Sequence, residues 1–411
     1  MINSNSNNKN CDICINEYEL SESKIPFSYW DTQDSRGELK RIQHELDYYE
    51  CSRCGFERIA THYSDEFKAI LYPKDFTSEA ISSKPEIVED IISWTNDELL
   101  NINKNKLVIG DFGCGTLSLL KGIKETHSSK DKILIGVDHR KPADHLDGDI
   151  EFYETDFDNP DFHTNLGYTK FDFIYFIHTL EHIFYPLDTL KTIRESLSDG
   201  GKLYIEVPAN ELIDKECLKS VALVHPQHLL YFSRHSLSLL LMKAGFEIIK
   251  SDLVITKGVP RLKFVANRST KNTNQDFEQK FLNQDNDSKK LCLIENALNI
   301  QTQINKNAAK KIENYLKVYK YLNIWGLGID FLDICKASAL ISEKIKSGNI
   351  RFIDSFLHDK KFRGIIIKKP NFLLRDNAPI IIPPLLSATR QSITSSIEDM
   401  KIDTSRILNI Y

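Results

Sequence analysis

The stretch KLVIGDFGCGTL at residues 106–117 constrains the fold of this 411-residue chain more than any other. Its first residues are apolar and partly β-branched, which predicts a buried parallel strand. Gly113 and Gly115 follow, and they let the backbone turn tightly and approach a ligand without a Cβ in the way. The residues after the turn have helical spacing. Strand, glycine turn and helix together predict a site where free backbone N–H groups face a cofactor.

Further apolar strands follow this turn, and several end at a polar side chain. We expect strands at residues 133–137, 151–153, 171–177 and 202–207, with helices at 85–100, 186–197 and 233–245. Asp138 follows the first of these strands, where a carboxylate suits a ribose because it accepts from both hydroxyls. Asp156 follows the next strand and His178 the one after it. The alternation predicts an α/β fold with a Rossmann-like sheet.

Two C-x-x-C pairs lie near the N-terminus, Cys11 with Cys14 and Cys51 with Cys54. Four thiolates are enough for a closed tetrahedral Zn²⁺ site. Because no ligand position is left open, the pattern predicts a structural zinc. Four unrelated buried thiols are the alternative, which the matched spacing disfavours. We expect the 36-residue insert between the pairs to hold a loop at SYWDTQDSRGEL, residues 28–39, and a strand at 46–49.

The composition and charge of the chain limit the partners and the cellular location that we expect for it. A net charge of −5 gives no basic footprint, so we expect no nucleic-acid partner. No apolar run reaches the roughly 20 residues needed to span a bilayer, so we expect no membrane partner. The N-terminus MINSNSNNKN is polar and does not resemble a secretory signal. Cysteines without such a signal favour a reducing cytoplasm.

The C-terminal part repeats the strand–turn–helix pattern. Residues 289–322 have helical spacing and predict a long connecting helix, a spacer or a homo-oligomer surface. Gly326 and Gly328 then follow a short apolar strand, with more strands at 350–353 and 379–382. This predicts a small α/β half-Rossmann domain, which need not keep a nucleotide. The predicted division is a zinc-binding domain at 1–65, the Rossmann-like domain at 66–268, a helical linker at 269–318 and a C-terminal α/β domain at 319–411.

Taken together, the central motifs resemble those of the class I S-adenosylmethionine-dependent methyltransferases. The residues that carry the resemblance are Asp111-x-Gly113-x-Gly115, Asp138, Asp156, the run HTLEH at 178–182 and the run DGGKLYIEVP at 199–208. The resemblance implies S-adenosylmethionine as cofactor, with its methionine part at the glycine turn, its ribose at Asp138 and its adenine beside Asp156. His178 is assigned to the same site. A hydride-transferring Rossmann enzyme is disfavoured because Leu117 stands where a third glycine would be.

The order of the whole chain is similar to that of the zinc-containing sugar C-methyltransferases, which act on nucleotide-linked keto-deoxysugars. In that family a histidine after the fifth strand is the proposed base, and here His228 in the run QHLLYFS matches it. The resemblance implies a small-molecule substrate, a nucleotide sugar, and a base at His228, with His182 and Tyr231 next in line. From the local sequence alone, His228 could equally pack against the helix that follows.

Two departures from the family keep other functions open. Gln227 stands where the family has a glutamate, and Ile329 follows Gly328 where the family has a lysine. An O- or N-methyltransferase of another small metabolite is one alternative. A non-catalytic binding protein that keeps the methyltransferase fold is another.

Overall fold

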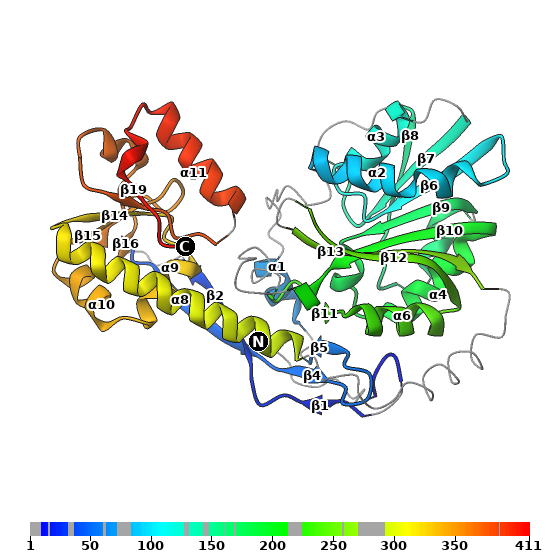
Figure 1. The fold of residues 1–411 in the computed structure, drawn as a ribbon, viewed down its shortest axis with the longest axis horizontal. Coiled ribbons are helices and arrows are strands. Elements are labelled where there is room, and N and C mark those ends of the chain that lie inside the picture. The colour runs from blue at the N-terminus through cyan, green and yellow to red at the C-terminus, as the bar shows by residue number, and fades with distance from the viewer. Residues whose placement is uncertain are drawn as a thin grey trace. The chain divides into compact units, whose positions relative to one another are not determined.

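The computed structural model describes residues 10–14, 17–31, 37–60, 63–71, 84–126, 131–142, 148–159, 161–167, 170–212, 224–256, 259–269, 292–385 and 387–411. These residues form two compact units (Figure 1). The first unit contains the described residues within 1–23, 47–213 and 226–294. The second contains those within 24–46, 214–225 and 295–411.

A seven-stranded sheet forms the centre of the first unit, in the order β12-β13-β10-β9-β6-β7-β8. Its strands are β6 (Lys106–Phe112), β7 (Asp131–Asp138), β8 (Ile150–Glu154), β9 (Phe171–Ile177), β10 (Leu197–Pro208), β12 (Phe246–Thr256) and β13 (Val259–Arg268). The five strands from β6 to β10 run parallel, whereas β12 and β13 pair antiparallel. The mostly parallel sheet confirms the predicted α/β class. Strand β13, which lies between β10 and β12, was not predicted.

Helices cover both faces of this sheet. They are α2 (Pro85–Leu100), α3 (Ser118–Thr126), α4 (Pro186–Ser196) and α6 (Arg234–Lys243). Figure 1 shows α2 and α3 on one face and α4 and α6 on the other. All seven residues of β9 are buried, as expected for a parallel strand covered on both faces. Gly122 brings α3 close to α2, because a Cβ there would lie 2.9 Å from Val88 and 3.0 Å from Ile92.

A smaller antiparallel sheet in the first unit joins the cysteine-bearing segments to a distant part of the chain. Its order is β1 (Glu19–Leu20), β4 (Tyr48–Glu50), β5 (Glu57–Ile59) and β11 (Leu230–Tyr231). Strand β11 comes from the connection beyond β10, and Leu230 pairs with Arg58. Helix α1 (Asp65–Leu71) follows β5 in sequence. The segment around His228 is therefore held by backbone pairing to the strand that follows Cys54.

The second unit has a parallel sheet of four strands in the order β15-β14-β18-β19. The strands are β14 (Leu322–Trp325), β15 (Ile350–Ile353), β18 (Ile380–Ile381) and β19 (Ile407–Leu408), beside the pair β16 (Lys361–Phe362) and β17 (Ile365–Ile366). Its helices are α8 (Leu293–Val318), α9 (Ile329–Lys336), α10 (Ala339–Lys346) and α11 (Ser387–Asp399). The long helix and the small α/β arrangement were both predicted. Helices α9 and α10 are separate because Ser338 caps α10, accepting from the N–H of Ile341.

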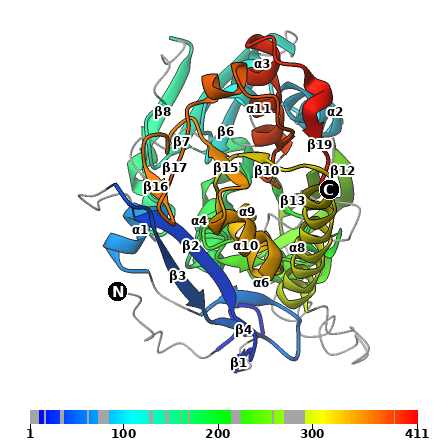
Figure 2. The same cartoon turned by 90° about the vertical axis from the view of Figure 1, so that its left-hand side faces the viewer.

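The insert between the cysteine pairs contains a hairpin of β2 (Ile25–Asp31) and β3 (Lys40–Leu46), visible in Figure 2. The predicted loop was therefore wrong for residues 28–31, which pair in register with 40–43. The hairpin groups with the second unit, because Trp30 Nε1 donates to the carbonyl of Leu327 at 2.9 Å. Residues 32–36 lie outside the described residues. The predicted four-domain division stays a prediction.

Short 3-10 helices complete the described residues, at Phe162–Leu166, Leu180–His182, Asn210–Leu212, Pro370–Leu374 and Thr404–Arg406. The second of these, η3 (Leu180–His182), follows β9 directly and carries candidate site residues. None of the described helices is both long and apolar enough to cross a bilayer.

The start of α8 depends on one buried carboxylate. Glu57 accepts from the N–H groups of Leu293 and Ile294 at 2.5 and 2.9 Å, and its side chain is almost fully buried. We expect Glu57→Ala to lower the free energy of unfolding by about 1–3 kcal/mol, because buried N–H groups lose their acceptor. The exposed Glu295 in the same first turn is the control. Urea denaturation in which Glu57→Ala and Glu295→Ala cost the same would contradict this.

Candidate active site

The glycine turn after β6 has the geometry of a ligand cradle. Gly113 has a φ of +83° and Gly115 a φ of +47°, both in the left-handed region that glycine tolerates. A Cβ at position 113 would overlap the side chain of Thr179, so the turn has no room for a side chain there. The N–H of Gly113 donates to the carbonyl of Val137 at 2.7 Å, which ties the turn to the end of β7.

Two predicted carboxylates meet beside this turn. Asp138 Oδ2 accepts from the N–H of Gly115 at 3.0 Å, and Asp138 Oδ1 lies 2.9 Å from His139 Nδ1. Burial opposes the ionisation of Asp138, but these partners lower its pKa overall. Asp111 is also buried, and burial together with the charge of Asp138 raises its pKa to about 8. The site therefore holds one ionised acid and one acid poised to ionise near neutral pH.

The remaining predicted cofactor residues lie at the same edge of the sheet. A hollow beside the turn is lined by Asp111, Gly113, Thr116 and Ile177, among others. Asp156 follows β8, is exposed, and accepts from the N–H of Asp158 at 3.0 Å. The arrangement offers carboxylate acceptors to hydroxyl or ammonium groups. The assignment of each residue to a ligand stays a prediction.

His178 is held between two buried glutamates at the end of β9. Its Nδ1 lies 3.3 Å from Glu181 Oε1, and its Nε2 lies 3.1 Å from Glu206 Oε1 without the direction of a good hydrogen bond. Burial disfavours the imidazolium, but the two glutamates raise the pKa of His178 to about 9. Glu206 also pairs with Arg261 at 2.6 Å, and its pKa is lowered to about 2 against the effect of burial. His178 is therefore a buried cation that faces carboxylates.

Two hydrogen bonds anchor the residues just before His228 to Tyr63 and to α1. Tyr63 donates its hydroxyl proton to the carbonyl of Pro226 at 2.7 Å. The side-chain amide of Gln227 donates to the carbonyl of Leu71 at the end of α1, also at 2.7 Å. The side chain of Gln227 is thus engaged with α1.

Hydrogen bonds also connect this segment to the turn after β9. His182 Nδ1 lies 2.7 Å from the carbonyl of Gln227, and the N–H of Leu229 donates to the carbonyl of Glu181 at 2.7 Å. The carbonyl of Leu229 in turn accepts from the N–H of Ile59 in β5 at 2.8 Å. These bonds fix the backbone of residues 227–229 between the two sheets of the first unit.

This framework brings Glu181, His182 and His228 together. A carboxylate oxygen and one ring nitrogen from each histidine all lie within 4.8 Å of one another. The two rings pack edge to face, with centroids 5.0 Å apart. His228 is buried, with 8% of its surface exposed. Tyr231 is fully buried in β11. The sequence analysis did not assign a role to Glu181, although it stands in the HTLEH run that was singled out.

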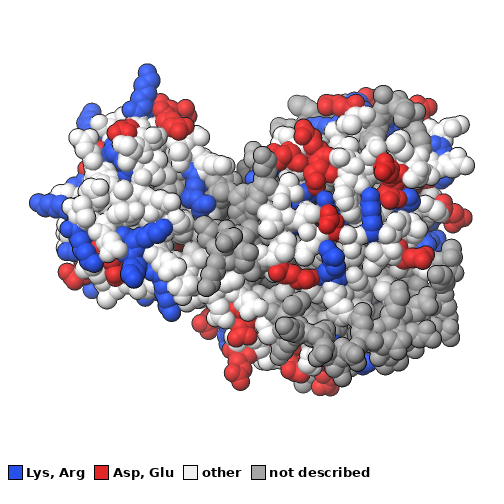
Figure 3. Space-filling model, in the orientation of Figure 1, with Lys and Arg blue, Asp and Glu red and all other residues white. Residues whose placement is uncertain are grey.

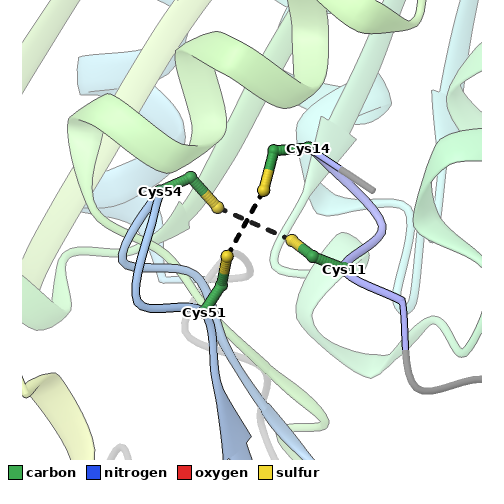
Figure 4. Close-up of side chains that lie close together, drawn as sticks. All are labelled: Cys11, Cys14, Cys51 and Cys54. Carbon is green, nitrogen blue, oxygen red and sulfur yellow. Dashed lines mark hydrogen bonds between the residues drawn. The ribbon is translucent and has the colours of Figure 1, made fainter. Parts of the chain in front are cut away.

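The four cysteines also converge, as Figure 4 shows. Sγ of Cys11 lies 3.6 Å from that of Cys54, and Sγ of Cys14 lies 3.3 Å from that of Cys51. All four are buried and none forms a disulfide. Gly55, with a φ of +65°, turns the chain directly after the second pair. Four converging sulfurs match the donor set of a tetrahedral structural zinc site.

The second glycine turn differs from the first. Asp354 follows β15, and its Oδ2 accepts from the N–H of Leu327 at 3.2 Å. Its Oδ1 accepts from the N–H groups of Phe356 and Leu357 at 2.9 and 3.0 Å. This acid therefore holds the turn together through both oxygens. A nucleotide at Gly326 and Gly328 stays a prediction.

Charge is distributed differently on the two units. On the face of the second unit that Figure 3 presents, Lys and Arg side chains gather over α8 and α10. Exposed lysines on these helices are Lys306, Lys310, Lys311, Lys317 and Lys346. The face of the first unit in the same view mixes both signs. The basic surface is thus a feature of the second unit.

Comparison with known proteins connects the central sheet to a family. Residues 88–251 match the model of a family described as a methyltransferase domain. A search of curated proteins found no match to the chain.

Several solved structures are similar to parts of the chain. One is a 1,6-didemethyltoxoflavin-N1-methyltransferase from Burkholderia thailandensis with bound 1,6-didemethyltoxoflavin and S-adenosylhomocysteine, at 17% identity and a TM-score of 0.36 over 50% of this chain and 86% of that one. Another is a SAM-dependent methyltransferase from Archaeoglobus fulgidus, at 16% identity and a TM-score of 0.35 over 44% and 93%.

The raised pKa of Asp111 predicts how stability depends on pH. In the folded state Asp111 stays protonated up to about pH 8, whereas its ordinary pKa is 3.8. The folded state therefore binds more protons across this range, and stability falls as pH rises through it. We expect the melting temperature of Asp111→Asn to fall less than that of the wild type between pH 6 and pH 9.

Asp172 is the matched control, since it is a buried carboxylate at the opposite end of the same sheet. Burial would raise its pKa, but hydrogen bonds from Lys104 and Ser198 lower it overall, so it stays ionised from pH 6 to pH 9. Asp172→Asn should lower the melting temperature equally at both pH values. Parallel wild-type and Asp111→Asn curves would show that Asp111 does not titrate in this range.

Proposed function

We propose that this protein is a class I S-adenosylmethionine-dependent methyltransferase that methylates a carbon atom of a nucleotide-linked keto-deoxysugar. The match of residues 88–251 to a methyltransferase domain and the mostly parallel sheet support the first part of this proposal. The observation that carries the proposal is the cluster of buried Glu181, half-buried His182 and buried His228, fixed by backbone hydrogen bonds beside the carboxyl ends of the parallel strands. Methylation next to a ketone needs a base at a fixed position, and this group supplies one.

The glycine turn and its carboxylates suit the cofactor. The cradle at Gly113 leaves no room for a Cβ, whereas a Cβ built on Gly115 would meet open space among the residues that the structure describes. We assign Asp111, Gly113 and Gly115 to the methionine part, Asp138 to the ribose hydroxyls and Asp156 to the adenine side. We assign His178, a buried cation, to the same cofactor site. When bound, the cofactor supplies an electrophilic methyl group on a sulfonium.

His228 is the proposed general base. A neutral imidazole takes a proton well near neutral pH, and a base in position typically contributes about 10²–10⁴-fold to the rate. Here it would remove a proton from the carbon beside the ketone and leave an enolate. His182 packs against His228 and is the next candidate. Tyr231 ranks behind both because its side chain is fully buried in β11.

The four cysteines are the proposed ligands of one structural Zn²⁺. Their sulfurs converge from two turns, and the charge and softness of four thiolates suit zinc. Strand β5 follows the second turn and pairs with β11, which carries the backbone just beyond His228. The metal would therefore support the position of the base without touching the substrate.

The decisive variant is His228→Ala. With thymidine diphosphate-4-keto-6-deoxyglucose as the acceptor probe, we expect turnover to fall by about 10²–10⁴-fold because the base is lost. Affinity for S-adenosylhomocysteine, measured by calorimetry, should stay near that of the wild type. In deuterated solvent with S-adenosylhomocysteine bound, exchange of the carbon-bound proton should stop. His235→Ala, a half-buried histidine on α6, should change none of these.

Other outcomes separate the alternatives. Normal turnover by His228→Ala would place the base elsewhere, at His182 first. Absence of exchange in the wild type, with methyl transfer to oxygen or nitrogen of another acceptor, would replace the carbon chemistry. Cofactor binding without methyl transfer to any of a panel of nucleotide sugars and small metabolites would favour a binding protein.

Metal removal tests the zinc proposal. We expect one zinc ion per chain by mass spectrometry, and chelation should unfold the segments that carry the cysteines because metal binding contributes folding energy there. Hydrogen exchange should then rise at the Ile59 amide, which donates to Leu229, and in β11. Activity should fall as a consequence of this disorder. Zinc well below one per chain in protein with intact exchange protection would count against the site.

A further inference from the structure

We infer that Glu181 is the carboxylate partner of His228, a positioning residue that orients the imidazole and stabilises it once it has accepted the substrate proton. The inference rests on the proposed role of His228 as base and adds the group that makes this base effective.

The carboxylate of Glu181 is buried and only half satisfied. Its side chain is 1% exposed, and Oε1 lies 3.3 Å from His178 Nδ1. Oε2 has no hydrogen-bond partner in the part of the chain that the structure describes. A buried oxygen without a hydrogen-bond partner costs free energy. A hydrogen-bond donor that forms during the reaction therefore binds this oxygen favourably. The ring nitrogens of His182 and His228, within 4.8 Å, are the nearby groups able to become that donor.

The segment of His228 provides no carboxylate of its own. Gln227 is neutral, and its amide donates to the carbonyl of Leu71 in α1. His182 directs Nδ1 to the carbonyl of Gln227, at 2.7 Å. Glu181 is therefore the acidic side chain of the three-residue cluster.

The backbone keeps Glu181 and His228 in register. The N–H of Leu229, the residue after His228, donates to the carbonyl of Glu181 at 2.7 Å. Any movement of one segment must move the other or break this bond. A carboxylate held in this way can orient an imidazole at little entropic cost, because neither backbone has to be ordered during the reaction.

The charges around the cluster favour a proton on His228. Among the described residues, the titratable and charged side chains on the surrounding elements include His178, His182, Glu206, Tyr63, Tyr231 and Arg58, which is paired with Asp12. His178 and Arg261 balance Glu206 and Glu181, so the buried network is close to neutral before the reaction. A proton that arrives at His228 adds one positive charge next to Glu181, and an opposite charge at this distance stabilises it.

The chemical step balances without a further reactant. The C–H bond breaks, its proton moves to a nitrogen of His228, and its electron pair remains on the substrate as the enolate. The enolate carbon then forms a bond to the cofactor's methyl group, while the electron pair of the broken carbon–sulfur bond stays on sulfur. Glu181 keeps its charge throughout and exchanges no proton.

Glu181→Gln tests the pairing first without any acceptor. In histidine-labelled protein with S-adenosylhomocysteine, the NMR titration of His228, assigned by its loss in His228→Ala, should move to lower pH by about one unit, because the carboxylate no longer stabilises the cation. Glu181→Asp should move it less. Asp172→Asn, the buried carboxylate at the other end of the sheet, should leave it unchanged. An unchanged titration in folded Glu181→Gln overturns the inference.

Turnover of the acceptor probe gives the second readout. Glu181→Gln should lower turnover roughly tenfold or more and shift the acidic limb of the pH profile to lower pH, with affinity for S-adenosylhomocysteine retained. Wild-type turnover in Glu181→Gln overturns the inference while His228 stands as base. A shifted titration with normal turnover in His228→Ala supports the pairing and overturns the base assignment instead.

Discussion

The hydrogen bond from the N–H of Leu229 to the carbonyl of Glu181 is the contact on which the arrangement of the candidate site depends. It joins the turn after β9 to the connection beyond β10, and the carbonyl of Leu229 accepts from Ile59 on the other side. Leu229 thus bridges the turn after β9 and the small sheet of the first unit. His228 precedes that residue, so its place is set by backbone contacts. Substitutions of nearby side chains can therefore change the chemistry while these backbone hydrogen bonds stay in place.

The buried charges behind this framework form an alternating series. Arg261, Glu206, His178 and Glu181 follow one another from the interior toward the cluster, and each cation touches at least one carboxylate. Removing one member would leave an uncompensated buried charge, which costs far more than a surface ion pair contributes. The series therefore makes the electrostatics of the site a property of several strands at once. It also explains how a histidine can stay charged at a position with almost no access to water.

The sequence predicted best those elements whose packing environment follows from their own hydrophobic pattern. Strand β9 and helix α2 have the predicted bounds, because a seven-residue apolar run and a regular amphipathic stretch define their environment locally. The hairpin strand at 28–31 and strand β13 were not anticipated, since their partners are decided by tertiary pairing. Glu181 illustrates the same limit within the site. Its motif was recognised, but its proximity to His228 and the outward bond of Gln227 exist only in the folded chain.

The hairpin between the cysteine pairs bears on how this protein assembles and how it can be divided. Between the first and the second cysteine pair, both of which belong to the first unit, the chain contributes β2 and β3 to the second unit. Closing the hairpin shortens the loop that separates Cys14 from Cys51 and so lowers the entropic cost of bringing the four sulfurs together. Leu39, buried against the core of the second unit, would lose its cover if residues 295–411 were deleted. The two units are consequently interleaved along the chain, and a truncation at their nominal boundary would produce a fragment with an exposed apolar strand pair.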